Sequence, residues 1–206
     1  MKSLYKLNWL NIKNNRYILL ALLLIIYGFV LPIILSYQSA QEDMAYIWFM
    51  YLQKMLFIPL IIMVGYLYKP YVEIEYVEVI QSIHKRHVLS YIFDDMCLVQ
   101  LFMLPFYCIL IFNDYQIIRY IFIIILQFCV IMSAYQMISS FTHSTTVSLG
   151  LILCYILLFS LALNDATIGN IFINGPIEYL QRSYFIICLM IIIVSFVVSY
   201  VMQKYR

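Results

Sequence analysis

Of the 206 residues in this chain, 66% are hydrophobic and 11% are charged, which excludes a single domain folded around a water-soluble core. The mean hydropathy of +0.95 predicts instead an all-α, polytopic membrane protein in which residues 1–206 form one transmembrane domain. The formal net charge of +2 says little by itself, and we expect no nucleic-acid partner.

Residues 1–15 are too polar for a signal peptide, and we expect them to be retained. In a helix, Lys2, Lys6 and Lys13 fall on one face with Trp9 beside them, and apolar residues lie opposite. Such a helix would lie in the inner membrane interface, with its lysines toward water and lipid phosphates. The alternative is a basic tail that only sets the topology.

Six stretches are apolar and long enough to span a bilayer, which takes about 20 helical residues. They cover residues 17–36, 45–68, 92–112, 117–140, 147–164 and 184–202. Three of these spans contain a proline, at Pro32, Pro59 and Pro105. Each proline removes a backbone donor, so we expect kinks or local unwinding there.

Lys54 is the basic residue placed well inside a predicted span, the second one. An ammonium group at that depth must snorkel to the surface, pair with another group or face a polar cavity. Lys54 is therefore either a snorkelling lysine of a span that begins later, or a candidate for the transport pathway or a dimer interface.

The segment 71–91, between the second and third spans, is the longest polar interruption in the chain. Helical spacing puts its apolar residues on one face and its charged residues on the other, which predicts an amphipathic surface helix. The apolar face holds Tyr76, Val79, Ile80, Ile83 and His87, and the polar face holds Glu75, Glu78, Gln81, Ser82, Lys85 and Arg86. This helix either connects two spans at the membrane interface or docks another protein.

Asp94 and Asp95 follow this segment, where we expect both carboxylates to stay hydrated and to end the polar stretch. Adjacent residues cannot share one helix face, so they do not predict a two-carboxylate site. The five cysteines all lie inside spans and are expected to be buried small hydrophobic residues. We expect no metal site, because no ligand motif is present.

The distribution of basic residues predicts the orientation. Nine of the 12 Lys and Arg residues fall on one side of a six-span arrangement: Lys2, Lys6, Lys13, Arg16, Lys69, Lys85, Arg86, Lys204 and Arg206. Both termini and segment 71–91 are therefore expected in the cytoplasm. Segment 165–182 would then face outward, and its apolar residues with Gly169, Gly175 and Pro176 predict a stretch that re-enters the membrane where protein covers its backbone.

This layout resembles the ABC-2 type permease family, the membrane subunits of ATP-binding-cassette exporters. EVIQSIHKR is similar to the family pattern E-x-L-x-S-x-P-x-S-R, matched at Glu78, Ile80, Ser82 and Arg86 with a slightly shortened spacing. His84 stands where the family usually has proline. SSFTHSTTVSLG resembles the family's short link between the fourth and fifth spans, and NGPIEYL resembles its outer proline segment.

The resemblance implies a subunit that hydrolyses nothing and carries no cofactor of its own. Two ATPase subunits, which bind ATP and magnesium, would dock on the cytoplasmic helix through Glu78, Val79, Ile80, Ser82, Ile83, Lys85 and Arg86. A second permease chain, identical or related, would complete the pathway in the cell membrane, expected to be a bacterial plasma membrane. The cargo would be hydrophobic or amphipathic, such as a peptide or an antimicrobial peptide in export or self-immunity.

Two other classes of protein are alternatives. A vitamin-binding membrane component of an uptake system has a similar size and span number, although such proteins tend to be rich in Gly and Ala, and this chain has five Gly. A membrane-embedded peptidase would need a nucleophile and a base, for which His84 and Cys97 are the weak candidates.

Overall fold

The computed structural model describes residues 12–37, 44–72, 88–159, 171–173 and 182–204. Within these ranges the secondary structure is helical and contains no strand, which confirms the all-α prediction. The elements are α2 (Arg16–Ile25), the π-helix η1 (Ile26–Val30), α3 (Leu31–Ser36), α4 (Met44–Met55), α5 (Phe57–Val72), α7 (Val88–Asn113), α8 (Ile117–Thr142), α9 (Thr145–Leu157) and α10 (Arg182–Lys204).

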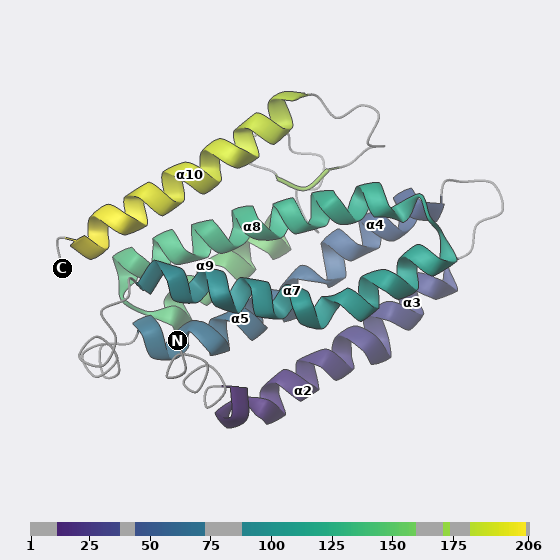
Figure 1. Ribbon diagram of the computed structural model, residues 1–206, viewed down its shortest axis with the longest axis horizontal. Coiled ribbons are helices and arrows are strands. Elements are labelled where there is room, and N and C mark those ends of the chain that lie inside the picture. The colour runs from purple at the N-terminus through teal and green to yellow at the C-terminus, as the bar shows by residue number, and fades with distance from the viewer. Residues whose placement is uncertain (1–11, 38–43, 73–87, 160–170, 174–181, 205–206) are drawn as a thin grey trace.

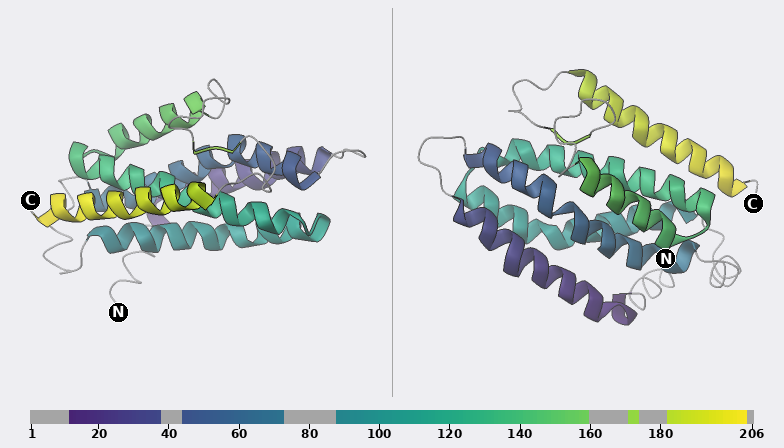
Figure 2. Two further views of the ribbon diagram at one scale, coloured as in Figure 1. Left: turned by 90° about the horizontal axis from the view of Figure 1, so that it is seen from above. Right: turned by 180° about the vertical axis from the view of Figure 1, so that it is seen from behind.

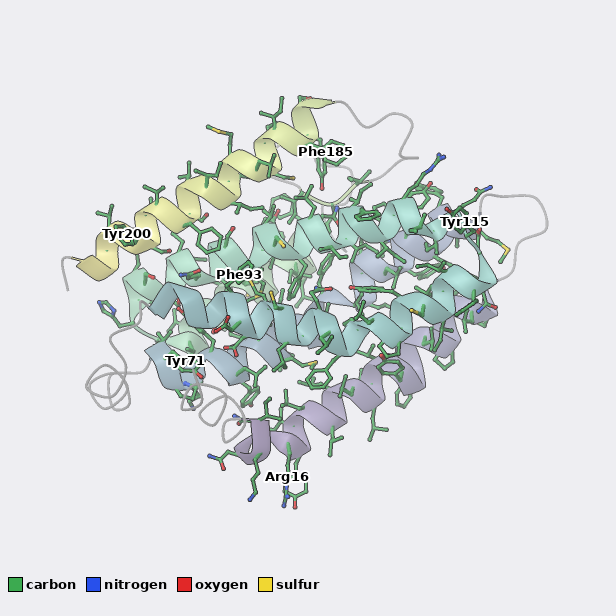
Figure 3. All side chains as sticks on the ribbon, viewed as in Figure 1. Arg16, Tyr71, Phe93, Tyr115, Phe185 and Tyr200 are labelled. Carbon is green, nitrogen blue, oxygen red and sulfur yellow. The ribbon has the colours of Figure 1, made fainter. Side chains whose placement is uncertain are left out.

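The α2–α3 stretch, the α4–α5 pair, α7, α8, α9 and α10 run in alternating directions along one bundle (Figure 1). α5, α8 and α10 end at the left of the view, where α7 and α9 begin, and α4 and α8 begin at the right. Tyr71 and Tyr200 accordingly lie at the end opposite Tyr115 (Figure 3). This alternation is expected for a chain that crosses a membrane several times.

α8 is the central helix of the bundle and contacts α4, α5, α7, α9 and α10. The α2–α3 stretch and α10 lie on opposite flanks, and the view from behind shows α9 covering the rear of the bundle (Figure 2). The core therefore surrounds α8, which supplies buried residues from Ile117 to Ser139.

Four continuous helical stretches are long and apolar enough to cross a membrane: Arg16–Ser36, Phe93–Asn113, Ile117–Thr142 and Ser183–Met202. The bent pair α4 and α5 makes a fifth candidate, whereas α9 is a shorter apolar helix. These helices support a multi-pass membrane protein. The fifth predicted span, residues 147–164, continues past α9 into residues outside the described ranges, so the six-span arrangement stays a prediction.

The second predicted span is broken rather than continuous. α4 and α5 meet at Leu56 and are bent by 42°. Pro59 lies three residues beyond the break and has no N–H to donate to the carbonyl of Met55. The expected distortion at this proline is therefore present, and it divides the span into two arms.

The other two prolines behave differently. Pro32 is the second residue after η1, the π-helical turn that interrupts the first span, as expected for local distortion at a proline. α7 continues through Pro105 as one helix, so the backbone is not unwound there. The Tyr27 hydroxyl donates a 2.7 Å hydrogen bond to the carbonyl of Phe102, in the turn that precedes Pro105. A neighbouring helix thus contacts α7 through a backbone carbonyl in the turn before its proline.

α8 and α9 are joined by only two residues, His143 and Ser144. His143 ends α8 in the left-handed conformation (φ 53°), and its N–H donates to the Ser139 carbonyl. The Ser144 hydroxyl accepts from the Val147 N–H and so caps the start of α9. Side-chain and backbone caps therefore close both helix ends within this link.

The outer surface of the bundle is largely apolar, with exposed aromatic and aliphatic residues on α2, α9 and α10. The prediction that all cysteines are buried is wrong for Cys97, Cys108 and Cys154, which are exposed; Cys188 is buried. In a membrane helix the lipid-facing side is as apolar as the core, so an apolar run does not reveal which side faces inward.

Gly65 on α5 marks a close approach to α9. A Cβ atom at this position would lie 3.2 Å from Leu149 Cδ1 and 3.7 Å from the Tyr135 hydroxyl oxygen. We expect Gly65→Val to lower the free energy of unfolding in detergent by about 1–3 kcal/mol, because the branched side chain overpacks this contact. Gly150→Val is the control: no heavy atom lies within 4 Å of a Cβ there, so little change is expected. Equal losses in the two variants would contradict the close approach.

Candidate functional site

A cluster of buried polar side chains lies in the bundle where α4 and α8 meet. Gln53 on α4 and Gln127 on α8 are 2% and 0% exposed, and the Gln127 Nε2 donates a 2.9 Å hydrogen bond to the Gln53 Oε1. Gln127 is the eleventh residue of α8, about 15 Å from its start at 1.5 Å per residue. Two carboxamides are thus placed deep within an apolar bundle, where polar groups need partners.

The two carboxamides hold a short piece of non-helical backbone, Ile171–Ile173. Figure 1 shows this piece as a short green ribbon between α8 and the beginning of α10. The Gln53 Nε2 donates to the Ile173 carbonyl at 3.0 Å, and the Ile173 N–H donates to the Gln53 Oε1 at 2.8 Å. A single side-chain amide therefore satisfies both backbone polar groups of Ile173.

The backbone of Ile171 is satisfied by three further helices. Its carbonyl accepts from the Gln127 Nε2 and from the Tyr184 hydroxyl, both at 2.9 Å, and its N–H donates to the Tyr155 hydroxyl at 3.2 Å. The Gln127 Nε2 also donates to the Tyr184 hydroxyl at 3.1 Å. Side chains from α4, α8, α9 and α10 thus converge on Ile171 and Ile173, which is the condition for non-helical backbone inside a membrane bundle. We call these groups the polar centre: Gln53, Gln127, Tyr155, Tyr184 and the backbone of Ile171–Ile173.

Phe172 anchors the same piece through its side chain. It is 6% exposed, and its ring lies 5.7 Å from the Phe57 ring and 6.3 Å from the Tyr155 ring, measured between centroids. Phe57 is the first residue of α5, directly after the break at Leu56. The polar centre therefore contacts both arms of the broken span, Gln53 on one side of the break and Phe57 on the other.

The chemistry of the polar centre favours binding. Carboxamide, phenol and backbone amide groups donate and accept hydrogen bonds, but none is a strong nucleophile or base at neutral pH. Among the residues that the structure describes, no three His, Cys, Asp or Glu side chains are grouped so as to hold a metal ion.

The predicted site residues are only partly within the described ranges. Lys54 lies on α4 next to Gln53 and is partly exposed, without a hydrogen bond to the polar centre. Lys13 is helical and exposed just before α2, whereas Lys2, Lys6 and Trp9 lie outside the described ranges. The structure thus leaves the alternatives for Lys54 open.

The coupling residues Glu78, Val79, Ile80, Ser82, Ile83, Lys85 and Arg86 also lie outside the described ranges, as does the peptidase candidate His84. The two ends of the predicted 71–91 helix belong instead to its neighbours: Tyr71 and Val72 end α5, and Val88–Tyr91 begin α7. Any separate surface helix is therefore confined to residues 73–87.

A second group of buried polar residues lies where α5, α7 and α8 meet. Asp95 is 3% exposed, and one of its carboxylate oxygens has no hydrogen-bond partner; Tyr68 on α5 and Tyr135 on α8 are buried as well. The Tyr68 ring lies 6.1 Å from the Tyr135 ring. The expectation that both adjacent carboxylates stay hydrated is wrong for Asp95. About 100° of helical rotation separates it from the half-buried Asp94, and this turns Asp95 inward.

Sequence reasoning selected the charged Lys54 and missed its uncharged neighbour Gln53, as well as Gln127, Tyr155 and Tyr184. The available signal was a carboxamide within an apolar run, as in FIIILQFCVIM, because such a group needs a partner inside the bundle. The sequence does not indicate which group a buried carboxamide contacts, because Gln53 and its partner Ile173 are 120 residues apart.

Comparisons with protein-family models, with curated proteins and with solved structures found no match to this chain. The resemblance to ABC-2 permeases therefore rests on the sequence features given above, and the function is argued from the site.

Proposed function

We propose that this chain is the membrane-spanning permease subunit of an ATP-driven ABC exporter and that it moves a hydrophobic or amphipathic cargo. The observation that carries the proposal is the polar centre beside a broken span. Non-helical backbone and interrupted helices deep in a membrane bundle mark the substrate sites of many transporters. In this proposal, α4 and α5 move relative to each other at the break at Leu56.

The energy source in this proposal is a separate pair of ATPase subunits. They dock on residues 73–87, which follow α5, so that their rigid-body movement on ATP binding is passed to α5 and the break. A second permease chain, identical or related, packs beside the first within the membrane. Support for the docking segment comes from its amphipathic pattern and its similarity to the family motif.

Co-purification tests the proposal. A tagged chain, extracted gently from the membrane of its native host, is expected to retain an ABC ATPase, and deletion of residues 78–86 is expected to release it. A bound vitamin in place of the ATPase would support the uptake component instead. Peptide cleavage by the isolated chain would support the peptidase. Either result without an ATPase would overturn the exporter proposal.

The orientation that accompanies this proposal predicts which face of the membrane each end of the bundle occupies. In a chain whose five cysteines are replaced by serine or alanine, Glu178→Cys should react with a membrane-impermeant thiol reagent in intact cells. Lys69→Cys, at the end of α5, should react only after the membrane is opened. Reaction of Glu178→Cys solely from the inside would contradict the six-span topology with cytoplasmic termini.

A further inference from the structure

The polar centre binds a part of its own chain in the way a receptor binds a peptide. Gln53 contacts both the N–H and the carbonyl of Ile173, a pairing that recognises backbone irrespective of side chain. Gln127, Tyr184 and Tyr155 complete the contacts to Ile171 in the same manner. In peptide recognition, main-chain hydrogen bonds of this type supply affinity, while side-chain contacts supply selectivity.

The side-chain contacts at this place select an aromatic or large apolar residue. Phe172 lies between Phe57 and Tyr155 and is almost completely buried. Ring pairs at such separations contribute more than the apolar area that they bury. The piece Ile171–Ile173 is therefore held by its backbone at both ends and by one aromatic side chain in the middle.

An unused hydrogen-bond acceptor remains beside the bound piece. The Gln127 Oε1 is completely buried and has no hydrogen-bond partner. An acceptor in this state costs free energy, which a donor such as a peptide N–H would recover. This observation is independent of the contacts to Ile171–Ile173, and it indicates that the carboxamide pair has unused capacity for a ligand with amide donors.

We propose that Gln53, Gln127, Phe57 and Tyr155 form a binding site for a peptide segment with a central aromatic or large apolar side chain. Ile171–Ile173 occupies this site in the resting chain and is displaced by the cargo. The inference rests on the proposed export function, because it names a peptide as the class of cargo. It also explains why a site built to bind amides is filled from within: an empty group of buried amides would be unstable in the bundle.

Binding of a short probe peptide to the purified chain in lipid nanodiscs tests this site, without any ATPase. The probe is radiolabelled N-acetyl-Ile-Phe-Ile-amide, and its matched control is the same peptide methylated on the nitrogen of the third residue. The control retains the apolar side chains but cannot donate to the Gln53 Oε1. The parent chain should bind the probe weakly, because the internal piece competes at high effective concentration.

Phe172→Ala should raise the affinity for the probe about tenfold or more, because the internal piece loses its aromatic anchor. The methylated peptide should gain less. Adding Gln53→Leu to Phe172→Ala should remove the difference between the two peptides. Phe122→Ala, at a 70% exposed position on α8, is the control variant and should change neither affinity. If Phe172→Ala does not fold, Phe172→Val, which removes the ring contacts and most of the apolar side chain, should give the same order of affinities.

Two results would overturn the inference: no gain in probe affinity in either Phe172 variant, or equal binding of the two peptides in all variants. Ile171–Ile173 would then be internal packing only. The outcome is separable from that of the proposed function. Failure of the probe leaves an ATPase-coupled permease for another cargo, whereas absence of an ATPase leaves a peptide-binding membrane protein of another class.

Discussion

Gln127→Leu should lower the free energy of unfolding by about 1–3 kcal/mol, whereas Gln136→Leu on the same helix should leave it unchanged or raise it. Gln127 loses hydrogen bonds to Gln53, Ile171 and Tyr184 when its amide is replaced. Side-chain hydrogen bonds in membrane proteins contribute on average about 0.6 kcal/mol and at most about 1.7 kcal/mol each. The expected loss of unfolding free energy is therefore the sum over the hydrogen bonds that the Gln127 carboxamide makes.

Gln136 is the matched control because it has the same side chain and the same complete burial, yet neither its Oε1 nor its Nε2 has a hydrogen-bond partner. Replacing an unsatisfied buried carboxamide with leucine removes a desolvation cost of about 1–3 kcal/mol. Unfolding of the purified variants by increasing SDS in mixed micelles measures both effects. Equal destabilisation by Gln136→Leu and Gln127→Leu would contradict this prediction, because it would show that the hydrogen bonds of Gln127 do not account for the loss.

The second large effect is expected at residues 73–87, where we propose that the ATPase docks. Ile80→Ala with Ile83→Ala should weaken ATPase association about thirtyfold or more, because truncating buried apolar anchors costs about 2 kcal/mol or more. Lys85→Ala with Arg86→Ala should have a much smaller effect, since exposed ion pairs contribute about 0–1 kcal/mol. Pull-down of the ATPase and transport-stimulated ATP hydrolysis, in detergent and in lipid, compare the two double variants.

A helix that only lies on lipid headgroups predicts a different order. In that case removal of the charges at Lys85 and Arg86 weakens membrane contact and leaves any ATPase association intact. Full association and coupling in both double variants would show that residues 73–87 only connect α5 to α7. The exporter proposal would then lose its main support from the sequence.

Hydropathy predicted the helices well because the bilayer imposes their length and composition. The predicted spans 17–36, 92–112, 117–140 and 184–202 each differ by at most four residues at either end from the helical stretches observed. Pro59 likewise indicated the distortion of the second span, since a missing N–H acts locally and is visible in the sequence.

The packing inside the bundle was not predictable in the same way. An apolar helix has no polar side to mark its outer face, so the exposed positions of Cys97 and Cys154 and the inward position of Asp95 could not be inferred. The polar centre joins residues that are far apart in the sequence, such as Gln53 and Gln127. Only the three-dimensional fold determines that their side chains meet.

The two-residue link between α8 and α9 has a mechanical consequence. Because only His143 and Ser144 join α8 to α9, we expect these two helices to move together, and Gln127 and Tyr155 to move with them. Gln53 lies on α4, on the other side of the bend from α5. We therefore expect a change of the bend angle that shifts α4 relative to α8 to break the hydrogen bond between Gln53 and Gln127.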